Sequence, residues 1–78
     1  MNKEEKVKKL KWLIKKIQRA IDEISWLRFD AMDVLEEHNY MLICNKNEKV
    51  VEGLRIEKSY LEDELKSLQE SKENTTNL

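Results

Sequence analysis

The chain has 78 residues, a formal net charge of −1, 40% charged residues, one cysteine, one glycine and no proline. A single cysteine excludes an intrachain disulfide and is typical of a reducing compartment. The near-neutral charge argues against a dedicated nucleic-acid binder, and no apolar run approaches the ~18 residues that a membrane span needs. We therefore expect a cytoplasmic, all-α protein with no membrane partner; if a phage encodes it, that cytoplasm is the host's.

The first half of the chain carries an apolar seam whose members alternate in steps of three and four residues. The seam begins at Val7 and continues to Leu35, with Arg28 as its one polar interruption. A second apolar line runs beside it with sevenfold spacing. Its members are Leu13, Ala20, Leu27, Val34 and Met41. This heptad pattern predicts one long helix over about 4–44, although residues 40–44 are also β-prone and a break near residues 38–39 is the alternative.

The second half carries a narrower seam. Asn47 is a typical N-cap residue, and Glu48 behind it complements a helix dipole. The seam then consists of Val51, Leu54, Lys58, Leu61, Leu65 and Leu68. These features predict a second helix over about 48–71, a single helical-hairpin domain over 1–72, and a disordered polar tail over 73–78.

A hairpin that turns at residues 45–47 leaves part of the first helix uncovered. Ser71 then lies near Ala20, and the aliphatic side chains before it, each worth ~1.5–3 kcal/mol when buried, have no cover. We expect a second copy to cover them in a dimeric four-helix bundle. The predicted dimer interface is Val7, Leu10, Leu13, Ile14, Ile17, Ala20, Ile21 and Ile24.

Charge is divided unevenly along the predicted first helix. Residues 1–19 hold eight Lys or Arg and two Glu, whereas residues 20–40 hold six Asp or Glu and one Arg. An antiparallel pairing of two such helices brings opposite charges together, and a parallel pairing stacks like charges. The pattern favours a two-fold antiparallel dimer centred near Ala20 and Ile21, with the parallel dimer as the open alternative.

Large aromatic residues lie outside the seam. Trp12 and Trp26 are two heptads apart on the opposite face, and Phe29 is close to Trp26. Tryptophan is enriched at interaction hot spots, so these three residues are candidates for binding another protein. Packing against flanking helices is the alternative.

The basic segment from Lys3 to Arg19 is a candidate for contacts with nucleic acid. The phosphate contacts would come from Lys8, Lys9, Lys15, Lys16 and Arg19. A solvated helix face is the simpler interpretation of the same residues.

We expect no catalytic residue, no metal site and no cofactor. The Glu-x-x-His motif of di-iron bundles is absent, because Leu35 precedes His38 by three residues. The sequence is best interpreted as a non-enzymatic homodimeric regulator or adaptor that binds another protein, with a composition suited to a low-GC bacterium or its phage. The alternatives are a nucleic-acid-binding regulator and a structural coiled-coil component.

Overall fold

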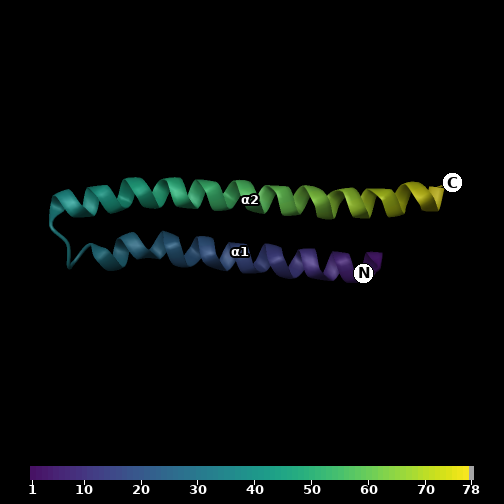
Figure 1. Ribbon diagram of the computed structural model, residues 1–78, viewed down its shortest axis with the longest axis horizontal. Helices are drawn as coiled ribbons and strands as arrows, with labels where there is room; N and C mark the ends of the chain where they lie inside the picture. The colour runs from purple at the N-terminus through teal and green to yellow at the C-terminus, as the bar shows by residue number, and fades with distance from the viewer. Residues whose placement is uncertain (78) are drawn as a thin grey trace.

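Two long antiparallel helices form a hairpin (Figure 1). The computed structural model describes the backbone of residues 1–77 and the side chains of residues 1–70. Helix α1 spans Lys3–Ala31 and helix α2 spans Glu37–Asn77. The molecule measures 62 × 16 × 16 Å, so its thickness is that of two packed helices. The all-α helical hairpin predicted from the sequence is confirmed.

Helix α1 begins with a side-chain cap. Asn2 has an extended backbone, and its Oδ1 accepts a hydrogen bond of 2.8 Å from the backbone N–H of Glu5. The Asn2 amide in turn donates to the Glu5 carboxylate at 3.3 Å. Glu4 and Glu5 lie in the first turn, where negative charge complements the positive end of the helix dipole. This reciprocal cap explains why the helix starts within one residue of the predicted Glu4.

The hairpin turns at residues 32–36, so the predicted helix boundaries of about 4–44 and 48–71 are wrong. The backbone N–H groups of Val34 and Leu35 both donate to the carbonyl of Ala31, at 3.2 Å each. No residue in the described chain has a positive φ, so the turn needs neither glycine nor asparagine. Helix α2 then starts at Glu37, and the carbonyl of Glu36 accepts from the N–H of Tyr40 at 2.9 Å.

The core is a single seam between the helices. From Val7 to Ala31, the α1 seam predicted from the heptad pattern is half-buried or buried against α2. Ile21 is the most buried apolar side chain, 3% exposed, and Ala31 and Val51 are also buried. On α2 the seam repeats in steps of four and three. It consists of Tyr40, Cys44, Asn47, Val51, Leu54, Lys58, Leu61, Leu65 and Leu68.

Two polar residues of α2 interrupt this seam and make bonds across it. The side-chain Nδ2 of Asn47 donates to the backbone carbonyl of Ile24 at 2.8 Å. The Nζ of Lys58 donates to the Oε1 of Gln18 at 2.6 Å. Asn47 is therefore an interior residue of α2 and not the N-cap that its position suggested. A polar residue within an apolar seam selects one alignment of two helices.

The uncovered end of α1 that the sequence predicted does not exist. Because the turn lies at 32–36, α2 runs along the whole of α1 and past its N-terminus (Figure 1). Leu10 and Leu68 line one surface hollow near the open end of the hairpin. Ile14 and Leu65 line another. The first half of α1 is thus packed by the chain's own second helix.

Two further features complete the fold. Within the described residues, neither helix has a stretch that is long and apolar enough to cross a membrane. The predicted disordered tail over 73–78 stays a prediction, because the side chains of residues 71–78 and the backbone of residue 78 lie outside the described part of the chain.

Candidate interaction surfaces

A pair of helices leaves most large apolar side chains of this chain accessible to solvent. Three apolar residues are buried in the described part: Ile21, Ala31 and Val51. The exposed ones are Met1, Trp12, Trp26, Leu27, Phe29, Met32, Val34, Met41, Leu42, Val50, Ile56 and Tyr60. These residues are distributed over both helices and the turn, so the surfaces on which they gather are described one by one below.

The residues predicted to form a dimer interface lie along the contact between α1 and α2. Ile21 is buried, and the other seven are half-buried: Val7, Leu10, Leu13, Ile14, Ile17, Ala20 and Ile24. Leu13 and Ala20 belong to the second apolar line, and they lie at the edge of the seam and not at its centre. Dimerisation through this set remains a prediction. The argument for it was an uncovered end of the first helix, and α2 covers that end.

An apolar groove lies on one side of the hairpin, in the half nearer the turn. It has a volume of about 350 Å³ and is lined by Ile24, Leu27, Leu42, Ile43, Lys46, Asn47 and Val50. Of the two polar members, Asn47 is already bonded to the Ile24 carbonyl. Leu27, Leu42 and Val50 are about half exposed. The groove therefore presents aliphatic side chains from both helices to solvent.

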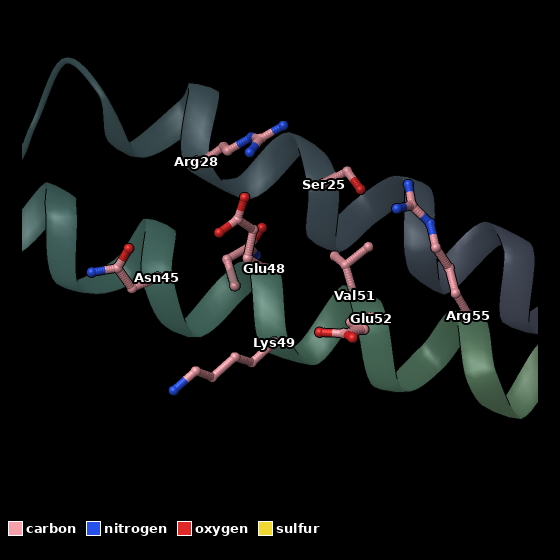
Figure 2. Close-up of a pocket in the computed structure, with 9 residues that line it drawn as sticks. Ser25, Arg28, Asn45, Glu48, Lys49, Val51, Glu52 and Arg55 are labelled. Atoms are coloured by element: carbon pink, nitrogen blue, oxygen red, sulfur yellow. The ribbon is translucent and has the colours of Figure 1, made fainter.

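The opposite side of the hairpin carries a polar groove. It has a volume of about 690 Å³, and Figure 2 shows Glu48 and Arg55 extending from α2 toward α1, whereas Lys49 points away. Arg28 of α1 lines the same groove. Acidic and basic groups are mixed in this groove, and no histidine or cysteine lines it. It offers no concentration of one charge for an ionic ligand.

The outer face of α1, which points away from α2, carries the aromatic residues singled out in the sequence. Trp26 is 64% exposed and Phe29 is 51% exposed, and their ring centroids lie 5.3 Å apart at an angle of 52°. The guanidinium of Arg28 lies 5.5 Å from the Phe29 ring centroid. Trp26 and Phe29 thus form one aromatic patch that the hairpin leaves accessible.

Trp12 lies on the same outer face but does not contact that patch. It is 49% exposed, and the ammonium groups of Lys9 and Lys16 lie 4.4 and 4.8 Å from its ring centroid. The other candidate phosphate contacts are also exposed: Lys8, Lys15 and Arg19. The five cations therefore share one accessible surface with Trp12 at its centre.

Tyr40 and Cys44 lie next to each other at the turn end of the α2 seam. A hydrogen bond with the Cys44 thiol, partial burial and the charge of that thiol raise the pKa of Tyr40 above its ordinary value, and Arg28 lowers it in part. Among the described residues, no group of three or more His, Cys, Asp or Glu side chains is placed to hold a metal ion.

Sequence reasoning identified the outer aromatic residues but missed the apolar groove. The groove depends on residues 42–50, which the sequence assigned to a helix end and a turn. The sequence did contain one indication of it: Ile43 and Val50 are seven residues apart. On α1 the same spacing relates Leu13, Ala20 and Leu27, which form a second apolar line beside the seam. Comparison of this chain with protein families, with curated proteins and with solved structures found no match.

Proposed function

We propose that this chain is a non-enzymatic regulator or adaptor, which associates with a second copy of itself and binds another protein through the apolar groove. The observation that carries the proposal is the apolar surface left by the hairpin: three buried apolar residues against twelve large exposed ones in the described part. A second copy and a partner protein would each cover part of it.

The energetic argument rests on the side chains that line the groove. Fully burying one Leu or Val contributes ~1.5–3 kcal/mol relative to leaving it in water. Leu27, Leu42 and Val50 are each about half exposed, so a partner that covers all three gains a few kcal/mol before binding costs are subtracted. This gain is enough for a specific contact only if the partner supplies a matching apolar face.

The shape of the groove favours a helix as the partner's binding element. Two parallel ridges of aliphatic side chains, one from each helix of the hairpin, leave a furrow along the helix axes. Amphipathic helices bind such furrows through residues spaced three and four apart. We therefore expect the partner to present the apolar face of a helix.

A synthetic amphipathic peptide with leucine at its seam positions and neutral polar residues elsewhere tests the groove. Its binding to the full chain is measured by fluorescence anisotropy. We expect saturable binding that Leu42→Ser weakens about tenfold or more, the order of a lost hot-spot contact.

Met41→Ser is the matched control, because Met41 is the neighbouring residue, is also exposed and does not line the groove. The control variant should bind as the wild type does. Equal weakening by the two substitutions, or no saturable binding at all, would refute the groove as a docking site.

A nucleic-acid-binding regulator is the second candidate, and the cluster of cations around Trp12 favours it. Lys9 and Lys16 lie over the ring, and lysines beside an aromatic face are a combination that binds single-stranded nucleic acid. Affinity for a labelled oligonucleotide that falls steeply with salt would support this role. Affinity independent of salt, or no binding at low salt, would exclude it.

A further inference from the structure

The outer face of α1 carries a second heptad seam that α2 does not cover. Its members follow one another in alternating steps of four and three residues, and every one is exposed. They are Lys8, Trp12, Lys15, Arg19, Asp22, Trp26 and Phe29. Such spacing gives a straight line of side chains that another helix can follow, so the outer face has the geometry of a helix-pairing surface.

The two tryptophans on this face have neighbours of opposite charge. On a helix the surface neighbours of a residue are three and four positions away. For Trp12 all four are lysines, namely Lys8, Lys9, Lys15 and Lys16. For Trp26 they are Asp22, Glu23, Phe29 and Asp30. One face of one helix therefore carries a basic aromatic patch and, two heptads away, an acidic aromatic patch.

These charges have no ionic partner among the side chains that the structure describes. Among the side chains of residues 1–70, the one ion pair within 4.0 Å joins Lys66 and Glu70 on α2. Asp22 does accept a hydrogen bond of 3.0 Å from the Gln18 amide, which occupies one of its two oxygens. Both patches are thus available to a molecule outside the chain.

We infer that the outer face of α1 binds the outer face of α1 in a second copy of this chain, antiparallel, about a two-fold axis that passes between Arg19 and Asp22. The inference rests on the self-association in the proposed function and names the surface that makes it. A two-fold contact requires a surface that is complementary to itself. A basic patch and an acidic patch on the same face meet that requirement.

In the antiparallel register, aromatic rings meet rings or cations, and basic residues meet acidic ones. Trp12 lies opposite the partner's Phe29, and Lys15 lies opposite the partner's Trp26, where its ammonium can stack on the ring. Arg19 lies opposite the partner's Asp22 at the centre. On one flank, Lys16 meets the partner's Glu23 and Lys9 meets the partner's Asp30.

A parallel pairing brings like charges together. Each lysine would lie beside its own counterpart, and so would each carboxylate, so that the charged positions of the seam and its flanks repel. The aromatic rings supply most of the affinity because they bury large apolar area. The exposed charge pairs contribute little each but determine orientation.

The apolar groove stays open in this assembly. It is lined by Leu27 and by α2 residues such as Leu42 and Val50, none of which belongs to the outer seam. The dimer therefore presents two grooves, one on each hairpin. A partner with two helical segments, or two partner molecules, can be held by one assembly.

A charge-exchange experiment tests the register. One variant combines Lys9→Glu with Lys16→Glu, and the second combines Glu23→Lys with Asp30→Lys. Each should weaken the homodimer about tenfold or more in dissociation constant, measured by sedimentation equilibrium, because all its flank pairs become repulsive. An equimolar mixture of the two variants should form a heterodimer, and the chain with all four substitutions should dimerise as the wild type does.

The recovery of the fourfold variant guards against misfolding as the cause of a loss. Lys49→Glu with Arg55→Glu is the matched control, since it changes net charge as the first variant does but on α2; it should leave the dimer unchanged. A chain that is monomeric at every concentration overturns the inference. So does a dimer whose dissociation constant is unchanged by both double substitutions. A loss of oligonucleotide binding in the first variant without any change in mass would also overturn it and assign the basic patch to nucleic acid.

Groove binding is measured on the same variants. Because none of the four substituted residues lines the groove, the synthetic peptide should bind all variants equally. If the chain does not dimerise but binds the peptide, the groove proposal stands and the dimer is refuted. If the charge-exchange variants behave as predicted but no variant binds the peptide, the dimer stands and the groove proposal is refuted.

Discussion

The side-chain amide of Asn47 in α2 donates a hydrogen bond of 2.8 Å to the backbone carbonyl of Ile24 in α1. Asn47 is 6% exposed, so this polar group lies inside the seam and not at its rim. The bond joins the two helices about midway between the turn and the contact of Lys58 with Gln18. Together the two contacts hold the hairpin in one alignment.

Asn47→Ala should lower the free energy of unfolding by about 1–2 kcal/mol, because a buried hydrogen bond and its packing are lost. Urea denaturation followed by circular dichroism measures the change. Asn45→Ala is the control, since Asn45 is exposed two residues away and should change stability by less than about 0.5 kcal/mol. Equal effects of the two substitutions would mean that the Ile24 contact is not stabilising.

Proline substitutions locate the turn. Glu37 is the first residue of α2, a position where proline is tolerated because the N–H has no partner within the helix. Lys46 lies inside α2, where proline should cost about 3 kcal/mol or more. Thermal unfolding should show Glu37→Pro close to the wild type and Lys46→Pro strongly destabilised. The reverse order would move the turn back to residues 45–47.

Gly53→Ala should stabilise the hairpin by about 1 kcal/mol, the helix-propensity difference between the two residues. Gly53 is exposed inside α2, it has no positive φ, and a Cβ placed there meets nothing within 4 Å. Chemical denaturation at low protein concentration measures the gain. A loss of stability would contradict the open, helical position that the structure gives Gly53.

Trp26→Ala should weaken self-association about tenfold or more, in keeping with the removal of an aromatic hot spot. The fold should survive, because Trp26 is 64% exposed. Sedimentation gives the dissociation constant, and circular dichroism gives the helix content. Tyr60→Ala removes an equally exposed aromatic residue from α2 and should leave the dissociation constant unchanged; a matching loss there would mean that the outer face of α1 is not the interface.

The α1 seam was predictable from the sequence, but the turn was not. From Val7 to Ala31 the heptad spacing alone identifies the residues that face α2. The turn Met32-Asp33-Val34-Leu35-Glu36 contains no glycine, proline or asparagine, and its backbone keeps negative φ angles. Composition therefore gave no marker there, whereas the residues typical of turns, Asn45, Asn47 and Gly53, all lie within α2.

The length of the two seams was the signal that could have located the turn. A turn at residues 32–36 lets α2 cover the whole length of α1, which removes the cost of an exposed aliphatic end. A turn at residues 45–47 leaves Val7 and Leu10 uncovered, and a second chain is one way to cover them. Asn47 favours that wrong turn, because an asparagine in an apolar seam resembles a helix cap when the carbonyl that it binds is unknown.

The candidate surfaces were predictable to different degrees. Trp12, Trp26 and Phe29 fall off the seam at any turn position, so the sequence placed them on the opposite face of the helix; that they are exposed and not packed against a flanking helix required the structure. The groove between Leu27 and Val50 requires the two helices to be aligned, and it could not be found without the correct turn. The charged residues around the two tryptophans can be identified from the sequence. That both patches are exposed required the structure, in which α2 packs against the opposite face of α1.

The central claim is that the exposed surfaces of this hairpin are completed by association with a second copy, and the molecular mass in solution tests it most directly. Sedimentation equilibrium of the purified chain over a wide concentration range should give a species of twice the 9.4 kDa chain mass, which dissociates on dilution and more readily in the Trp26→Ala variant. A folded chain that sediments as a monomer at every concentration would contradict the claim.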